Sequence, residues 1–302
     1  MPRATTLLAT AALTLAGTAG GLAAAPSSYA ASSPSTITIG NQGFGEDEIV
    51  ADIYADVLQA HGFKTSIKST TGRNQVIAAL AAGQVDVEPD YAGSLLVSLN
   101  PKATKQATSL STDVPGLKRA LAKDKATVLN PSKALDTNVF VVLRRTASKY
   151  HLSTLSSLKS VAPQLVFGAP PECPRYYYCL PGLKAVYGLK FKNFVATDEA
   201  GPEAVADLKS GKVQVVELFS SNGDLLQNKD FVALADNKHL EPADYMIPVV
   251  RKAVAGAVAA PLNAADAKLT TAQLEQLNID YNNHEDPATV ASGWVKKEGL
   301  VK

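Results

Sequence analysis

The sequence predicts an α/β fold with two lobes, each a mostly parallel sheet with flanking helices. Segments rich in β-branched residues alternate with amphipathic helical segments along most of the chain. This alternation begins near residue 36 and begins again near residue 138, and its pattern close to the C-terminus returns to that of the first unit. Such a series favours parallel strands covered on both faces. Two crossings of the chain between the lobes are the simplest arrangement.

The first unit is expected to open with a strand at Thr36–Gly40, followed by a glycine-rich turn and a helix that ends at Gly62. The stretch KTSIKST predicts the next strand. A second helix follows, with Asn74 as its N-cap and Gly83 after its last turn. A third strand, QVDVEPDYAG, is expected to end at Pro89.

The second unit begins with the apolar strand NVFVVLRR, a short helix over 153–160 and the strand QLVFGAP. We then expect the helix GPEAVADLKSG, the strands KVQVVELF and FVALAD, a return through YMIPVVRK, and closing helices near Thr271–Leu277 and Pro287–Glu298. The predicted boundaries are 36–137 for the first part of lobe 1, 138–245 for lobe 2 and 246–302 for the return to lobe 1.

The N-terminus, residues 1–31, has the features of a secretory signal peptide. An apolar run rich in alanine and leucine follows Arg3 and ends in small residues. We expect cleavage near Ala30 or Ala31; an uncleaved membrane anchor is the alternative. No cysteine lies at the expected cleavage site, so lipid attachment there is not expected. The mature protein is expected at the outer face of the cell membrane.

Two cysteines, Cys173 and Cys179, enclose a short loop that contains one arginine and three tyrosines: Arg175, Tyr176, Tyr177 and Tyr178. In an oxidising compartment we expect the cysteines to form a disulfide. Closing so short a loop stabilises the chain by about 2 kcal/mol. Because a chain of this length builds its own core, the bridge serves to shape the loop, either as a structural turn or as part of a ligand site.

Charge and motifs argue against several classes of protein. The formal net charge is +1 and the basic residues are scattered, so nucleic acid is not an expected partner. The four histidines lie far apart, which argues against a zinc site, and no cofactor is expected. The common hydrolase and phosphate-loop motifs are missing from the sequence, so catalysis is not expected. A secreted hydrolase built on FSSNGD is the enzymatic alternative.

Five segments, in order, resemble the solute-binding proteins of glycine betaine, choline and carnitine ABC importers. They are GNQGFGEDEIVADIYADVLQAHGFK, AALAAGQVDVEPDYAGS, LPGLKAVYGLKF, LKSGKVQVVELFSSNGDL and DPATVASGWVKKEGL. The resemblance covers nearly all of the mature chain. It implies a type II periplasmic-binding-protein fold, a quaternary-ammonium solute bound between the lobes, and an ABC permease as partner.

The resemblance also implies which residues surround the ligand. It places Tyr91, Phe140 and Phe219 in an aromatic cage, although Phe140 and Phe219 also suit a plain strand core. A further family tyrosine is missing near Val205, and a tyrosine of the cysteine loop, Tyr176, Tyr177 or Tyr178, is the candidate to replace it. Polar contacts at the rim are implied for Gln42, Gly43, Phe44, Asp90 and Ser94.

Whether the ligand carries a carboxylate stays open at this stage. The family holds a betaine carboxylate with an arginine, and that position falls on Tyr176, one residue from Arg175. With a shift of one residue, Arg175 makes a bidentate contact with the carboxylate. Otherwise the ligand is a cation without a carboxylate, such as choline.

The expected protein is thus a monomeric, extracytoplasmic solute-binding protein. The alternatives are a secreted sensor or adhesion domain with the same two lobes, and a binding protein for a different small solute.

Overall fold

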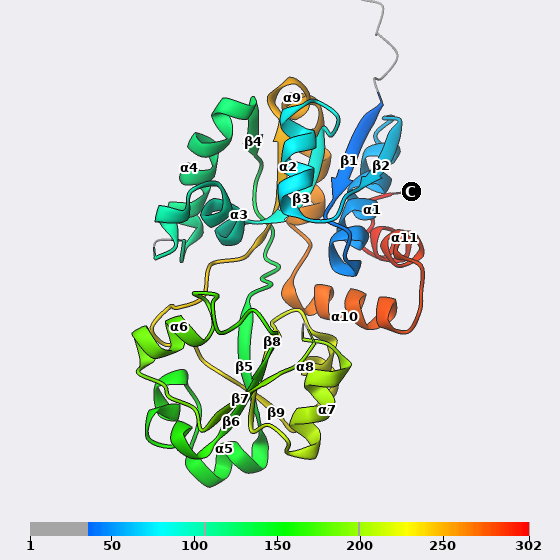
Figure 1. Cartoon of the computed structure of the whole chain (residues 1–302). Helices are drawn as coiled ribbons and strands as arrows, with labels where there is room; N and C mark the ends of the chain where they lie inside the picture. The colour runs from blue at the N-terminus through cyan, green and yellow to red at the C-terminus, as the bar shows by residue number, and fades with distance from the viewer. Residues whose placement is uncertain (1–35, 106, 199, 302) are drawn as a thin grey trace, which may run out of the picture. The chain divides into compact units, whose positions relative to one another are not determined.

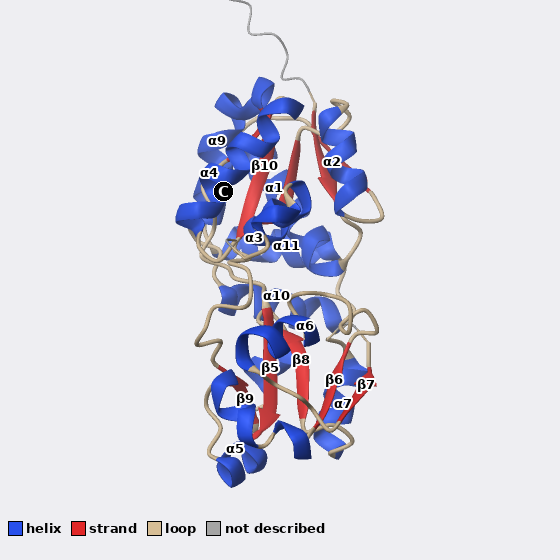
Figure 2. Ribbon diagram, turned by 60° about the vertical axis from the view of Figure 1, so that its left-hand side comes forward, coloured by secondary structure: helices blue, strands red, loops and turns tan. Residues whose placement is uncertain are grey.

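The computed structural model describes residues 36–105, 107–198 and 200–301. The predicted signal sequence, residues 1–31, lies outside the described residues. The described chain forms two five-stranded sheets, each flanked by helices (Figures 1 and 2). We name the sheet of order β2-β1-β3-β10-β4 with its helices lobe 1, and the sheet of order β7-β6-β8-β5-β9 with its helices lobe 2.

Lobe 1 is made by the chain before the first crossing and after the second. Its strands are short, and its helices pack on both faces of the sheet. Its strands are β1 (Ile37–Asn41), β2 (Thr65–Ser69), β3 (Val87–Tyr91), β4 (Ala126–Val128) and β10 (Met246–Arg251). Its helices are α1 (Gly45–Ala60), α2 (Arg73–Ala81), α3 (Ala92–Leu99), α4 (Leu110–Ala120), α9 (Lys252–Asp266), α10 (Thr271–Asn282) and α11 (Pro287–Lys297), with short turns at Pro101–Ala103 and Leu121–Asp124.

Lobe 2 is made by the continuous stretch between the two crossings. Its strands are β5 (Asn138–Leu143), β6 (Val166–Ala169), β7 (Asn193–Ala196), β8 (Val215–Phe219) and β9 (Phe231–Leu234). Its helices are α5 (Arg144–Tyr150), α6 (Leu180–Gly182), α7 (Pro202–Ser210) and α8 (Gly223–Gln227), with short helical turns at Leu155–Ser160, Ala162–Gln164 and Leu183–Tyr187.

Each sheet is mixed, with one strand that runs against its neighbours. In lobe 1, β10 is antiparallel to β3 and β4; in lobe 2, β5 is antiparallel to β8 and β9. Both reversed strands are the first strand after a crossing. A strand that enters from the other lobe runs away from that lobe, whereas the remaining strands run toward it. The prediction of mostly parallel sheets is therefore confirmed, with this one reversal in each.

Each sheet is covered on both faces by a separate hydrophobic cluster. In lobe 1, α1, α9 and α11 bury one face with residues such as Ile53, Leu262 and Trp294. The opposite face of that sheet packs against α2, α3 and α4. In lobe 2, Phe140 and Phe167 lie in the cluster on one face, whereas α7 covers the other. The burial of both faces explains the continuous apolar run of β5.

In the first unit, two predicted boundaries differ from the structure. Helix α2 has Gly72, not Asn74, as its N-cap, so Asn74 lies within the first turn. Strand β3 continues through Pro89 to Tyr91. Pro89 faces Pro248 of β10, which confines the two missing backbone donors to a single position of the ladder. The predicted helix ends at Gly62 and Gly83 are confirmed, because both glycines have positive φ angles, 86° and 74°. Among the described residues, no helix combines the length and apolar character that crossing a bilayer requires.

Candidate functional site

A cavity of about 310 Å³ lies where the carboxyl ends of β3 and β8 meet the two crossings. Ligand sites of open α/β sheets collect at this end of the strands. Lobe 1 contributes Phe44, Tyr91 and Ser94 to the lining. The crossings and the strand that follows the first of them contribute Asp136, Asn138 and Asp244, and lobe 2 contributes Pro170, Glu172, Cys173, Tyr176, Glu217 and Phe219.

Two rings form the lobe 1 wall of the cavity. Phe44 ends the turn before α1 and stacks on Tyr91 at the end of β3, with ring centroids 6.3 Å apart and planes 20° from parallel. The Tyr91 hydroxyl donates a hydrogen bond to Glu46 Oε1 at 2.7 Å. Tyr91 is 5% exposed and Phe44 is 41% exposed. The wall therefore consists of one fixed ring and one ring at the mouth of the cavity.

The disulfide loop forms part of the opposite wall. Cys173 and Cys179 are bonded, with their Cα atoms 5.2 Å apart, which confirms the predicted bridge. Tyr178 is buried, and its hydroxyl donates to the carbonyl oxygen of Thr104 at 2.8 Å. Tyr176 packs edge-on against Tyr178, with centroids 5.5 Å apart, and lines the cavity. The bridge and the buried Tyr178 thus position Tyr176.

Four carboxyl groups line the same cavity, and two of them are held by serines. Asp244 accepts hydrogen bonds from the Ser94 amide at 2.6 Å and the Ser94 hydroxyl at 2.7 Å. Asp136 accepts from the Ser221 hydroxyl at 2.7 Å. Burial raises the pKa of Asp244 to about 6, against the lowering effect of the Ser94 hydrogen bonds. Burial, together with the nearby Glu46, raises the pKa of Asp136 well above its ordinary value.

The other two carboxyl groups, Glu172 and Glu217, belong to lobe 2. Glu217 is 5% exposed on β8, and its burial together with the charge of Glu172 raises its pKa to about 8. Its Oε2 lies 2.7 Å from Cys179 Sγ, but a disulfide sulfur has no hydrogen to donate. Behind this wall, the Asn138 side-chain amide donates to Glu241 Oε2 at 2.9 Å. Because none of the described residues that line the cavity is a lysine, arginine or histidine, Glu217 has no positively charged partner there.

Cys173, Cys179 and Glu217 lie close enough together to resemble a metal-ligand group. Because the two sulfurs are bonded to each other, they offer no thiolates to a metal ion. We therefore assign no metal to this cluster.

The structure brings five of the sequence-predicted site residues to the cavity: Phe44, Tyr91, Ser94, Tyr176 and Phe219. Phe140 does not line it. This residue lies two positions inside β5, is 1% exposed, and packs its ring against Phe167 at 5.9 Å in the core of lobe 2.

The remaining predicted contacts also lie outside the lining. The backbone N–H of Gln42 donates to Asp47 Oδ2, and Gly43 forms the turn before α1 with a φ of 84°. Asp90 forms an ion pair with Arg73. Tyr177 and Tyr178 pack inside the disulfide loop, and Arg175 is exposed.

The sequence prediction missed the acidic part of the site, Asp136, Glu172, Glu217 and Asp244. Only Glu217 carries a local signal, because it is a charged residue inside the apolar strand VVELF. Asp136 and Asp244 lie on different crossings, and their proximity depends on the fold.

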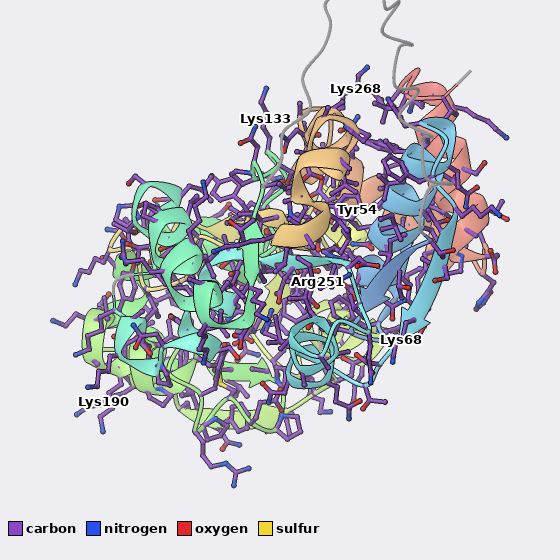
Figure 3. All side chains as sticks on the ribbon, turned by 90° about the horizontal axis from the view of Figure 1, so that it is seen from above. Tyr54, Lys68, Lys133, Lys190, Arg251 and Lys268 are labelled. Carbon is purple, nitrogen blue, oxygen red and sulfur yellow. A yellow bond between two sulfur atoms is a disulfide. The ribbon has the colours of Figure 1, made fainter. Side chains whose placement is uncertain are left out.

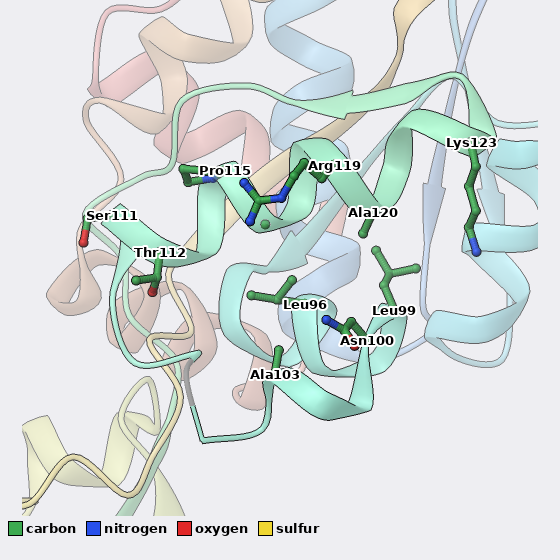
Figure 4. Close-up of a pocket in the computed structure, with 11 residues that line it drawn as sticks. Leu96, Leu99, Asn100, Ala103, Ser111, Thr112, Pro115, Arg119, Ala120 and Lys123 are labelled. Carbon is green, nitrogen blue, oxygen red and sulfur yellow. The ribbon is translucent and has the colours of Figure 1, made fainter.

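The described chain also has hollows that are larger than this cavity. A groove of about 1150 Å³ shares Phe44, Asp136 and Phe219 with the cavity and continues along α7 and α10. A hollow of about 780 Å³ lies between α3 and α4, with Arg119 and Lys123 at its edge (Figure 4). No aromatic ring is present among the described residues that line this second hollow, and it lies away from the strand ends. We therefore take the smaller cavity as the candidate ligand site.

Comparison with known proteins identifies the family of this chain. The family model described as the substrate-binding domain of ABC-type glycine betaine transport systems matches residues 35–297. The glycine betaine-binding protein YehZ of Escherichia coli is 25% identical over 284 residues, which cover 89% of this chain and 92% of that protein. A glycine-betaine-binding protein of Pseudomonas aeruginosa is 26% identical over 285 residues, covering 88% of this chain and 89% of that protein.

A solved structure shows the same fold. The crystal structure of a glycine betaine/carnitine/choline ABC transporter protein matches with a TM-score of 0.76 at 22% identity, over 87% of this chain and 99% of that chain. The two lobes, each with a mixed sheet, are therefore those of a type II periplasmic binding protein, as the resemblance implied. Because the family model spans nearly the whole described chain, this protein belongs to the family of substrate-binding domains of ABC-type glycine betaine transport systems.

Proposed function

We propose that this protein captures a small quaternary-ammonium solute outside the cytoplasm and delivers it to the permease of an ABC importer. One observation carries the proposal. Rings from both lobes, Phe44 and Tyr91 on one side and Tyr176 and Phe219 on the other, line a single cavity of about 310 Å³. The glycine betaine-binding relatives and the family membership support the same class of ligand.

The chemistry of such a ligand matches the lining. A quaternary ammonium group has no N–H to donate, so ring faces and carboxylates are its natural partners. Each ring contributes about 0.5–2 kcal/mol, depending on how much water is excluded. Micromolar binding corresponds to about 8 kcal/mol. Four rings together with the nearby carboxyl groups supply much of this free energy, and closure of the lobes supplies further contact.

The rest of the proposal follows from the family. Its members are substrate-binding transport proteins, so we propose no catalysis. The protein acts as a monomer that closes on the solute and opens when it docks on the permease. Residues 1–31 direct its export, and the mature chain begins near Ser32.

Isothermal titration calorimetry on the mature chain tests the proposal. Glycine betaine, choline, carnitine and proline betaine are titrated separately, and at least one is expected to bind with a Kd in the micromolar range or below. Phe219→Ala should weaken that binding about tenfold, since it removes one ring from the lobe 2 wall. Tyr150→Ala is the matched control, because Tyr150 is an aromatic residue of α5 outside the cavity lining. If none of the four solutes binds measurably, the proposed ligand class is refuted.

A further inference from the structure

We infer that the cavity selects an organic cation that carries no carboxylate, such as choline, over a zwitterion such as glycine betaine. This inference rests on the proposed function and names the ligand class within it. It decides the question that the position of Arg175 in the sequence left open.

The first step is the sign of the charge that surrounds the cavity. Four of its lining residues carry carboxyl groups, Asp136, Glu172, Glu217 and Asp244. Two further carboxyl groups lie directly behind the lining. Glu46 is bonded to the Tyr91 hydroxyl, and Glu241 to the Asn138 amide. Among the described residues that line this cavity, none is a lysine, arginine or histidine.

The basic residues of the neighbourhood are already paired. Arg73 donates from Nε to both oxygens of Asp90, at 2.9 and 3.1 Å, and from Nη2 to Asp90 Oδ1 at 2.7 Å. Because the two groups form one bidentate ion pair, the pair adds no net positive charge beside the cavity. In the adjoining groove, Lys209 Nζ lies 3.6 Å from Asp224 Oδ1.

Other basic residues lie on the outside of the molecule. Arg175 is exposed and is not among the lining residues, although its neighbour Tyr176 is. Lys68, Lys133, Lys190 and Lys268 point outward (Figure 3). The molecule thus combines a formal net charge of +1 with an acidic cavity.

The second step is what this arrangement does to each ligand. A trimethylammonium group is attracted by the carboxylates and by the ring faces, and a ligand hydroxyl can donate to a carboxylate. A ligand carboxylate finds no cationic partner and meets like charge, which costs affinity and discriminates against the zwitterion. The cavity therefore attracts the trimethylammonium group that choline and glycine betaine share. It repels the carboxylate that only glycine betaine carries.

Three probes test this selection: choline, glycine betaine and the methyl ester of glycine betaine, in which the carboxylate is neutralised. In calorimetry with the mature chain at pH 7.5, choline and the ester should bind at least about 30-fold more tightly than glycine betaine. Equal or tighter binding of glycine betaine would overturn the inference and leave the proposed function intact. If none of the three probes nor any other quaternary-ammonium solute binds, the proposed function fails as well.

Variants locate the source of the selection. At pH 9, where the carboxyl group of Glu217 is ionised, Glu172→Gln combined with Glu217→Gln should reduce the ratio of choline to glycine betaine affinity by about tenfold, because both side chains keep their size and lose their charge. Glu203→Gln removes an exposed carboxylate of α7 outside the lining and should leave the ratio unchanged. Arg175→Ala should change neither affinity. Loss of glycine betaine binding in that variant would show that Arg175 reaches the ligand, which contradicts the inference.

Discussion

Tyr91 and Glu46 are joined by a hydrogen bond of 2.7 Å that connects the end of β3 to the first turn of α1. The second oxygen of Glu46 accepts from the Asn278 side-chain amide of α10 at 2.6 Å. One carboxylate therefore holds three elements of lobe 1 together behind the cavity wall. Because Tyr91 is the most deeply fixed ring of that wall, its orientation depends on this bond.

Two replacements of Tyr91 should distinguish the contribution of the ring to solute affinity from that of the hydroxyl. Tyr91→Ala removes the ring and should weaken binding of the best solute at least about tenfold. Tyr91→Phe keeps the ring and loses the bond to Glu46, so we expect a smaller loss, about threefold. Calorimetry on both variants, with Tyr150→Ala as control, measures the difference. Equal affinity of Tyr91→Ala and the unmodified protein would remove Tyr91 from the site.

The disulfide should matter more for binding than for folding. The double variant Cys173→Ala, Cys179→Ala opens a loop that closes over few residues, so the free energy of unfolding should fall by only about 2 kcal/mol. Tyr176 then loses part of its support, and solute affinity should fall several-fold. Thermal unfolding and calorimetry on the same sample give the two values. A variant that does not fold would show that the bridge is needed for the core.

Solute affinity should depend on pH through two carboxyl groups of the cavity. The pKa of Asp244 is raised to about 6, and that of Glu217, near Glu172 and Glu241, to about 8. Each attracts a cation only when ionised, so the affinity for choline should rise as the pH increases from 5 to 9. Binding near pH 7.5 should release protons, which calorimetry in buffers of different ionisation enthalpy detects. An affinity that stays constant over this range would contradict the prediction.

Glu217 should also make the ligand-free fold less stable at high pH. Burial raises its pKa in the folded chain from 4.5 to about 8. The folded state therefore binds this proton more tightly than the unfolded state. The resulting contribution to stability is fully present below about pH 4.5 and is lost as the pH rises through 8. Glu217→Gln should gain stability relative to the unmodified protein between pH 5 and 9, on the order of 3 kcal/mol. Denaturant unfolding at the two pH values measures the change.

Local sequence signals predicted most of the strands because those signals act over a few residues. The strands β1, β2, β5, β6, β8 and β9 follow from runs of β-branched residues, and α1 and α7 follow from helical periodicity. The helices α3, α4, α5, α6, α8 and α9 were not predicted. Helix α3 begins directly at the end of β3, without a turn between them, while α4 and α9 contain Pro115 and Pro261, which weaken the helical pattern.

The family resemblance predicted one part of the site and could not predict the other. Tyr91 and Phe219 occupy positions that the motifs fix within their own segments, and both line the cavity. Phe140 belongs to the same kind of motif but lies in the core, because it sits one pleat deeper in β5 than Asn138, which lines the cavity. A sequence pattern predicts that a residue lies in a strand and on which face of the sheet. Whether that residue reaches the cavity depends on its distance from the end of the strand, where the sheet meets the crossings.

Local sequence patterns thus predicted most of the strands, the two cysteines that close the loop, and the aromatic residues available to a cation. The charge of the cavity, in contrast, depends on the three-dimensional fold. Asp136, Glu217 and Asp244 come from two crossings and a strand, and they converge because both crossings pass the carboxyl ends of β3 and β8. The sequence does not indicate that these three residues lie close together, because their proximity depends on the long-range packing of the two sheets.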